Sequence, residues 1–416
     1  MSSTKVIVPQ LAWHEDNELE LDFPSSWSVR FCAMRGYTAT PLDDVGIRRA
    51  FANPIGTKTI KELAAGKSEV VIVFDDMSRP TKVHQIVPHV LEELRAAGVP
   101  DKGIRFIVAQ GTHGDHTRWD FERKLGFEIV ERYPVYNHNP YENCTPVGTT
   151  PLGTPVSINA EVMACDLKIG IGAILPHPMA GYGGGAKIVM PGVASIDTIG
   201  HNHHMCIWGR SPDDRHPSLG FNKHAGNIMR ADMNEAARLA RWDIKIDGML
   251  NGRRDFVALF VGDIVAEHEA AVPIAREHYR TERPGECDVV VCNAYSRANE
   301  GFFSAFAGTA FLGPDGGDIV LLLSCPEGQV VHHLAGAFGK FTHGRSSHHA
   351  DRLPPNVHRM IVVSPIRDHA PLYGTLLNDQ LIWVKTWAEA RELLEQGHPQ
   401  GARVAVIPDS TIQYFA

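Results

Sequence analysis

The sequence lacks the features that mark disulfide-rich, membrane-spanning and secreted proteins. Its seven cysteines are an odd number, and no Cys-x-x-Cys motif occurs among them, which argues against a disulfide framework and for a reduced compartment. No apolar run approaches the roughly 20 residues that a membrane-spanning helix needs. The N-terminal residues show no basic region followed by an apolar one, as a secretory signal would. We therefore expect a cytoplasmic protein with no membrane partner.

The sequence also lacks a concentration of charge of one sign. The 40 lysine and arginine residues and the 48 aspartate and glutamate residues give a net charge of −8, and no basic cluster stands out. This argues against nucleic acid and anionic membranes as the main partner, but it allows a small anionic substrate bound by a few local cations. With 44% apolar residues, the 416-residue chain can form two or three domains.

Short β-branched runs alternate with amphipathic stretches along the chain, which is typical of an α/β fold. Residues 69–74 and 104–109 predict buried strands, and residues 84–97 between them predict a helix. The second half predicts a helix at 387–396 and the buried parallel strands 288–292, 318–324, 359–364 and 403–408. We expect two lobes, each built on a mainly parallel sheet with flanking helices, and an active site in the cleft between them.

A domain boundary is expected in the charged stretch 276–286, which contains Pro284-Gly285. The prediction is an N-terminal domain of residues 1–280, which carries the cofactor and the catalytic residues, and a C-terminal domain of residues 281–416, whose tail could return to the first domain. Ligands of open α/β sheets bind beyond the carboxyl ends of the strands. The loops that follow predicted strands are therefore the candidate sites.

The first candidate loop, residues 75–81, follows a predicted strand directly. Arg79 could hold a carboxylate through two parallel hydrogen bonds, and Asp76 could accept hydrogen bonds from hydroxyl groups. The alternative is an ion pair between an aspartate and the arginine that only fixes the loop.

The second candidate loop, residues 111–116, has His113 between glycines at a strand end. This histidine could be a general base near neutral pH. The alternative is a histidine that caps the helix predicted at 117–125.

The third candidate loop, residues 176–187, contains four glycines and Lys187. Backbone N–H groups of such a loop could face an anion such as phosphate. It is not a Walker A loop, because Ile188 follows the lysine, and as a dinucleotide fingerprint it is weak, because Ala186 takes the place of the last glycine.

Three histidines occur in the four residues 201–204. They could include a metal ligand, although neither a His-Glu-x-x-His motif nor a cysteine pair with zinc spacing lies nearby. The alternative is a polar helix start.

In order and spacing, these loops resemble the nickel-dependent lactate racemase family over most of residues 40–210. The resemblance rests on five stretches, which are DDMSRPT at Asp75–Thr81, AQGTHGDHT at Ala109–Thr117, GTTPLGTPVSIN at Gly148–Asn159, PHPMAGYGGGAKIVMPGVAS at Pro176–Ser195 and NHH at Asn202–His204.

The resemblance implies a cofactor and a set of roles. The family uses a nickel-pincer nucleotide, the nickel complex of pyridinium-3,5-bisthiocarboxylic acid mononucleotide, so Lys187 would tether it covalently and His203 would bind the nickel. His113 and His177 would be the acid and base, and Arg79 would bind the substrate carboxylate. Further cofactor contacts are expected from Asp76, Ser78, Gly183 and Gly184. Protein made without the cofactor-biosynthesis enzymes, which are expected partners, would lack the group.

The residue types suit this chemistry. The C2 hydrogen of a 2-hydroxycarboxylate is a poor acid, because the carboxylate resists further negative charge, so its removal as hydride needs an electron-accepting cofactor. A histidine must take the hydroxyl proton, and one histidine on each side of the substrate suits inversion of the carbon.

One stretch departs from the family. Members that act on lactate carry a glutamine and a lysine three residues apart, where this sequence has Ser304 and Ala307. The loss of a long cation and an amide would open the pocket. We therefore expect Ser304 to contact a 2-hydroxycarboxylate substrate larger than lactate, with a sugar acid such as gluconate favoured over an aryl-substituted acid.

Two other functions stay open. One is a nicotinamide-dependent 2-hydroxyacid oxidoreductase with a single catalytic histidine. The other is a non-catalytic protein that binds an anionic ligand, which would need Arg79 and the glycine-rich loop but not both His113 and His177.

Overall fold

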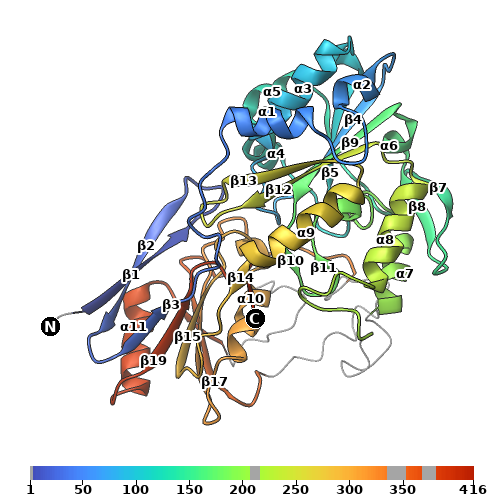
Figure 1. The fold of residues 1–416 in the computed structure, drawn as a ribbon. Helices are drawn as coiled ribbons and strands as arrows, with labels where there is room; N and C mark the ends of the chain where they lie inside the picture. Colours follow the sequence, from blue (N-terminus) through green and yellow to red (C-terminus); the bar gives the residue numbers. More distant parts are fainter. Residues whose placement is uncertain (1–2, 207–215, 335–352, 368–380) are drawn as a thin grey trace. The chain divides into compact units, whose positions relative to one another are not determined.

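The structure is a computed structural model that describes residues 3–206, 216–334, 353–367 and 381–416 (Figure 1). The chain forms two compact units. The central unit comprises residues 38–278, and the terminal unit joins residues 1–37 to residues 279–416. None of the helices in the described residues has the length and apolar character needed to cross a bilayer.

The central unit is built on a six-stranded sheet with the order β13-β12-β9-β4-β5-β6. Neighbouring strands are parallel except β13, which pairs antiparallel with β12. Every residue of β4 and β9 is buried, as is usual in parallel sheets with both faces covered. The strands are β4 (Val70–Asp75), β5 (Ile104–Ala109), β6 (Val135–Asn137), β9 (Leu167–Ala173), β12 (Ile244–Leu250) and β13 (Phe256–Gly262).

The winding of this sheet reverses between β4 and β9. From β4 the chain adds β5 and β6 on one side, and it then adds β9, β12 and β13 on the other side. In open α/β sheets, ligands bind beyond the carboxyl ends of the strands at such a reversal. The three candidate loops follow β4, β5 and β9, so the fold brings them to one edge of the sheet.

Helices and short hairpins surround the central sheet (Figure 1). The predicted helix at 84–97 begins as a 3-10 turn and continues as α3, because Pro88 is tolerated in the first helical turn. The helices are α1 (Asp44–Ala52), α2 (Ile60–Ala64), α3 (Val87–Ala96), α4 (Arg118–Leu125), α5 (Phe127–Arg132), α6 (Ala160–Ala164), α7 (Ile196–Cys206), α8 (Ile228–Leu239) and α9 (Ala266–His278). The 3-10 turns are η1 (Val83–Gln85), η2 (Asp101–Gly103) and η3 (Gly185–Ile188). The hairpins are β7 (Cys144–Thr149) with β8 (Pro155–Asn159) and β10 (Pro176–His177) with β11 (Gly181–Tyr182).

The terminal unit is built on a second six-stranded sheet, β18-β17-β16-β15-β19-β3, in which all neighbouring strands are parallel. Its strands are β3 (Ser28–Phe31), β15 (Val289–Asn293), β16 (Gly317–Leu322), β17 (Val357–Val363), β18 (Leu381–Val384) and β19 (Arg403–Ile407). Its helices are η5 (Ala298–Glu300), α10 (Phe302–Thr309) and α11 (Trp387–Gly397). Two further pairs are β1 (Ser3–Gln10) with β2 (Asn17–Pro24) and β14 (Arg280–Thr281) with β20 (Tyr414–Phe415).

Both ends of the chain differ from the expected domain ranges. Residues 1–37 were expected in one domain with residues 38–280, but β3 pairs with β19, and Val8, Leu21 and Phe23 of the β1–β2 hairpin share a core with strands β15 and β16. The C-terminal tail pairs within the terminal unit, where β20 lies beside β14. Pairing between distant segments leaves no local mark in a sequence.

The α/β class and the parallel sheets are confirmed. The predicted strand at 104–109 coincides with β5, and a capping box between Thr386 and Glu389 opens α11. The expected cleft between two lobes stays a prediction.

Candidate active site

The loop after β4 is organised around the carboxylate of Asp76. Its Oδ1 accepts hydrogen bonds from the backbone N–H of Ser78 at 3.1 Å and from Ser78 Oγ at 2.6 Å. Its Oδ2 binds Nδ1 of His113, which comes from the loop after β5. All three residues are buried, so loops from two neighbouring strands are joined by contacts shielded from water.

This pairing sets the charge of Asp76 and the tautomer of His113. Burial opposes ionisation of Asp76, but the charge and hydrogen bond of His113, aided by the charge of Arg79, outweigh burial and hold the pKa of the carboxyl well below its usual value. An ionised carboxylate only accepts hydrogen bonds, so His113 carries a proton on Nδ1. The lone pair of the neutral ring is then on Nε2, which is the arrangement of a general base oriented by a carboxylate.

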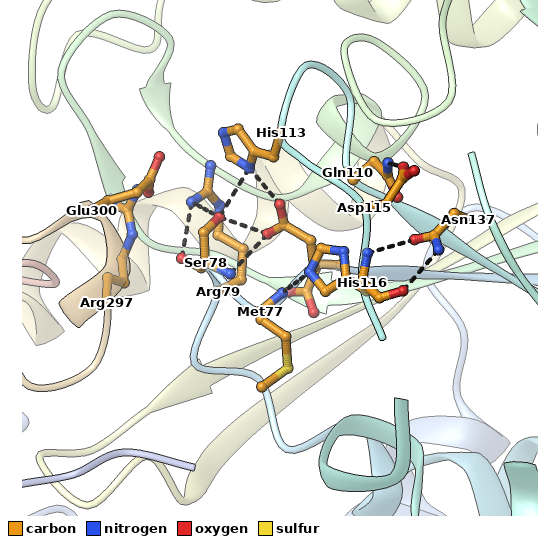
Figure 2. A network of polar contacts seen from close by, with 12 residues as sticks. Met77, Ser78, Arg79, Gln110, His113, Asp115, His116, Asn137, Arg297 and Glu300 are labelled. Atoms are coloured by element: carbon orange, nitrogen blue, oxygen red, sulfur yellow. Dashed lines mark hydrogen bonds and ion pairs between the residues drawn. The ribbon is translucent and has the colours of Figure 1, made fainter. Parts of the chain in front are cut away.

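Arg79 lies beside the same pair and is partly buried. Its Nη1 donates to the carbonyl of Ser78 at 3.0 Å and to Ser78 Oγ at 2.8 Å. Figure 2 shows that Arg79 and His113 both contact Ser78. A guanidinium next to a histidine base is suited to a ligand that carries a carboxylate. The structure thus brings together four of the predicted site residues, Asp76, Ser78, Arg79 and His113.

Sequence reasoning missed Lys124, a fully buried lysine of α4 that holds the β4 loop. Its Nζ donates to the carbonyls of Asp76 and Arg79 at 2.9 and 2.8 Å, and it pairs with the carboxylate of Asp75 at 2.8 Å. Burial lowers the pKa of Lys124 and raises the pKa of Asp75, and the attraction between the two opposes both changes. One ammonium group therefore fixes three points of the loop. Lysine in a charged helix gives no sign of such a role.

His116 fixes the same loop through a different bond (Figure 2). Its Nε2 accepts the backbone N–H of Met77 at 3.1 Å. Its own backbone N–H and carbonyl bind the side-chain amide of Asn137, each at 2.9 Å. Burial lowers the pKa of His116, so the ring stays neutral and keeps its acceptor nitrogen.

His177 lies in β10, the first strand of the short hairpin that follows β9. Its Nδ1 accepts the backbone N–H groups of Met179 and Ala180 at 3.2 and 3.1 Å. The neutral ring therefore carries its proton on Nε2. At Nε2, His177 therefore has a hydrogen-bond donor, whereas His113 has a lone pair at its own Nε2.

The glycine-rich segment continues from this hairpin toward Lys187. Gly183 donates its N–H to the carbonyl of Leu175 at 2.6 Å, and Gly185 donates its N–H to Asp247 Oδ2 at 2.5 Å. These two N–H groups are engaged within the protein, so the idea that they face a phosphate is wrong. Lys187 itself lies in η3 and is partly buried. Contacts of Gly183, Gly184 and Lys187 with a cofactor stay predictions.

His203 lies well inside α7 rather than at a helix start. Its Nδ1 donates to the carbonyl of Ile199, one turn earlier, at 3.0 Å, which leaves the lone pair on Nε2. Burial, together with the charge of Lys187, lowers the pKa of His203 to about 4, so the ring is neutral at neutral pH. A neutral imidazole oriented through its second nitrogen is the form in which histidine binds metals.

Helix α7 is anchored by Asp232 of α8, a second residue that sequence reasoning missed. The buried carboxylate accepts hydrogen bonds from Asn202 Nδ2 at 2.7 Å and from the hydroxyls of Thr150 and Thr154 at 2.5 and 2.8 Å. Asn202 directly precedes His203, so these contacts fix the helical turn that presents the histidine.

His203 could supply one protein ligand to a metal. Within the part of the chain that the structure describes, no group of three or more histidine, cysteine, aspartate or glutamate side chains could hold a metal ion. A metal held in an organic pincer needs only one protein ligand. His203 has the required lone pair, and the charge of Lys187 acts on it.

Ser304 belongs to α10 of the terminal unit. It is buried, and its Oγ donates to the carbonyl of Gly301 at 2.6 Å. The hydroxyl proton is thus used inside the helix, and a ligand could be bound only through the oxygen lone pair. Its role in substrate binding stays a prediction.

Comparisons with known proteins agree on one family. The model of the lactate racemase N-terminal domain matches residues 14–213. The lactate racemase of Lactiplantibacillus plantarum is 29% identical over 388 residues, which is 87% of this chain and 88% of that protein. The lactate racemase of Thermoanaerobacterium thermosaccharolyticum is 28% identical over 288 residues, 68% of this chain and 66% of that protein.

Two solved structures share the fold. The lactate racemase apoprotein from Thermoanaerobacterium thermosaccharolyticum matches with a TM-score of 0.70 and 23% identity, over 99% of this chain and all of that one. A protein from Thermotoga maritima matches with a TM-score of 0.64 and 16% identity, over 91% of this chain and all of that one. The chain is therefore similar to lactate racemases in sequence over most of its length, and it shares its fold with a lactate racemase apoprotein.

Proposed function

We propose that this protein inverts C2 of a 2-hydroxycarboxylic acid larger than lactate, with a sugar acid such as gluconate as the favoured substrate. The observation that carries the proposal is the buried Asp76–His113 pair beside Arg79, which combines a histidine base with a cation suited to a carboxylate. The names of the two relatives, both lactate racemases, support the reaction class.

The proposed cofactor is the nickel-pincer nucleotide, with Lys187 as its covalent attachment and His203 as the protein ligand of nickel. When bound, this group supplies the acceptor and donor for the C2 hydride. The lone pair on Nε2 of His203 and the proximity of the Lys187 charge support these two roles.

The chain's own residues handle the carboxylate and the proton. Arg79 orients the substrate through its carboxylate, and His113 accepts the proton of the 2-hydroxyl at Nε2 as C2 is oxidised. Asp76 stabilises the imidazolium that forms, because the charges of the imidazolium and of Arg79 favour the ionised carboxylate. The product of this step is a planar 2-keto acid with two faces. His177 donates a hydrogen bond from its Nε2–H to the substrate oxygen, and the proton held by His113 returns to that oxygen as reduction on the second face inverts C2.

The larger substrate is supported by the sequence of α10. By the family resemblance, Ser304 and Ala307 stand where members that act on lactate carry a glutamine and a lysine, and neither supplies a long cation or an amide. A substrate with its own hydroxyl groups beyond C2 would replace those interactions.

The test is an assay of the loaded enzyme against lactate, gluconate and mandelate with no external oxidant. The chain is produced with the cofactor-biosynthesis enzymes, and the C2 configuration is read by chiral chromatography or NMR. We expect gluconate to be inverted faster than lactate. Preference for lactate would contradict the substrate proposal, and stoichiometric NADH formation would favour the nicotinamide-dependent oxidoreductase.

The cofactor is tested separately by mass. Intact-mass spectrometry is expected to find an adduct and bound nickel on the wild-type chain but not on Lys187→Ala. Lys187→Arg is the matched control, because it keeps the positive charge but cannot form the amide. Full turnover by either variant would contradict the tethered cofactor.

A further inference from the structure

A buried cluster of five ionisable side chains lies against the glycine-rich segment. Its members come from α8, β12 and α9 of the central unit, and none is more than 3% exposed. They are Arg230, Lys245, Asp247, Glu267 and His268. Buried ionisable groups are destabilising unless they are well paired, so a cluster of this size calls for a role beyond packing.

The cluster binds the main chain of four consecutive residues, 182–185. Arg230 donates to the carbonyl of Gly184 at 2.9 Å and also to that of Tyr182. His268 Nε2 donates to the carbonyl of Gly183 at 2.8 Å. Asp247 Oδ2 accepts the N–H of the fourth residue, Gly185, at 2.5 Å. Each residue of the run is therefore held by a side chain.

The glycines allow this close approach. Gly184 has φ of 73°, and a Cβ there would lie 2.6 Å from Asp247 Oδ2. Gly185 has φ of 54°, and a Cβ there would lie 2.9 Å from the ring of His268. Any side chain at these positions would push the segment away from the cluster.

The protonation states within the cluster match these contacts. Burial lowers the pKa of His268 well below its usual value, so the ring is neutral and Nε2 carries the donated proton. Burial lowers the pKa of Arg230 to about 10, so the guanidinium stays charged at neutral pH. Asp247 is paired with Lys245, and burial, together with the charge of Asp247, raises the pKa of Glu267 well above its usual value.

We propose that Arg230, Asp247 and His268 are positioning residues that hold residues 182–185 in one conformation and thereby orient Lys187 for attachment of the cofactor. The attachment rests on the proposed function, whereas the clamp on the segment does not. Lys187 follows the clamped run by two residues, and its N–H donates to the carbonyl of Gly184 at 3.3 Å. A shift of the run therefore moves the main chain of the lysine directly.

The first test is hydrogen–deuterium exchange of the apoprotein, read by mass spectrometry on peptides that cover residues 181–189. His268→Leu removes the bond to Gly183, and we expect exchange in this segment to rise about tenfold, because one buried hydrogen bond is lost. His268→Gln places an amide N–H near the same carbonyl and is expected to restore slow exchange.

A matched control lies on the same helix. His278 of α9 also donates through Nε2 to a carbonyl, that of Leu250, at 2.8 Å. His278→Leu is therefore expected to leave exchange in residues 181–189 unchanged. Slow exchange in β4 and β5 of the central sheet shows that the unit carrying each variant is folded. Arg230→Lys keeps the positive charge but cannot donate to the carbonyls of Tyr182 and Gly184 through two separate nitrogens. It serves as a second variant if His268→Leu fails to fold.

The second test is the fraction of chains with an adduct on Lys187 after production with the cofactor-biosynthesis enzymes. We expect His268→Leu to lower this fraction several-fold and His268→Gln to recover it. The proposal is overturned if residues 181–189 of His268→Leu exchange at the wild-type rate. It is also overturned if they exchange faster but the fraction of chains with an adduct on Lys187 is unchanged. A wild-type chain without any adduct would count against the proposed function instead, and the exchange result would still decide the clamp.

Discussion

His113 and His177 follow strands on either side of β4, and the protein holds them in opposite ways. His113 faces the carboxylate of Asp76 through Nδ1, whereas Nδ1 of His177 faces two backbone N–H groups of its own hairpin. The first environment places a proton on Nδ1 and the second excludes one. Two residues of the same type are thus prepared as a base and as a donor.

This difference bears on what His177 can do without rearrangement. If His177 is to act as a base, its Nδ1 must carry a proton, and the N–H groups of Met179 and Ala180 must then turn away. His113 needs no such rearrangement. Proton exchange by His177 in either direction therefore needs hairpin movement, whereas hydrogen-bond donation from its Nε2–H needs none.

The largest expected effect comes from Asp76→Asn. The amide side chain no longer fixes the Nδ1 proton of His113 or stabilises the imidazolium, so kcat should fall by about three to four orders of magnitude, as it does for other histidine bases that lose their carboxylate. The measurement is the initial rate of C2 inversion by enzyme with a full Lys187 adduct.

Ser78→Ala is the control for this variant. It removes the 2.6 Å bond from Ser78 Oγ to Asp76 but leaves the carboxylate, so a loss of about tenfold is expected from one hydrogen bond. If the asparagine variant lost no more activity than the alanine variant, Asp76 would not orient the base.

A smaller effect separates the roles of His177. In His177→Asn the amide oxygen can take the place of Nδ1 and keep the hairpin bonds, but the Nε2–H is lost. In His177→Gln an amide N–H takes the place of Nε2–H. If His177 is only a donor, the glutamine variant should be about tenfold more active than the asparagine variant. Equal inactivity would show that His177 exchanges a proton during turnover and that the hairpin must open.

The smallest effect concerns stability. His116 shares a loop with His113 but is fixed as an acceptor, as His177 is, and burial lowers its pKa. Below the usual histidine pKa of about 6.5 the unfolded chain binds a proton that the folded chain does not, so stability falls as the pH falls through this range. His116→Gln, which can still accept the N–H of Met77, should show a shallower decline of the urea midpoint below pH 6.5. An unchanged slope would mean that His116 does not contribute to it.

The parts of the molecule that could be predicted are those written in local patterns. The strand at 104–109 and the loops with Asp76, Arg79 and His113 are such cases, because hydrophobic runs and strand-end positions are visible in sequence. The tautomer of His177 was not predictable, since it depends on hairpin N–H groups that only the folded turn aims at the ring.

Residues that act through long-range contacts left no signal at all. Lys124 and Asp232 lie in helices that carry several other charged residues, and their partners belong to loops far away in the chain. The phosphate-cradle interpretation of the glycines was wrong at Gly183 and Gly185 for a similar reason. The glycines permit close approach, but the sequence does not say whether a ligand or the buried cluster is what approaches.

The division of the chain has a consequence for how the protein is made. The central unit is complete once residue 278 has been synthesised, whereas β3 must wait for β19 near the end of the chain before it can join its sheet. During synthesis, all residues of the central unit therefore leave the ribosome while the first 37 residues still lack their partner strand. Chains truncated before β19 should keep an intact central unit and fail in the terminal one.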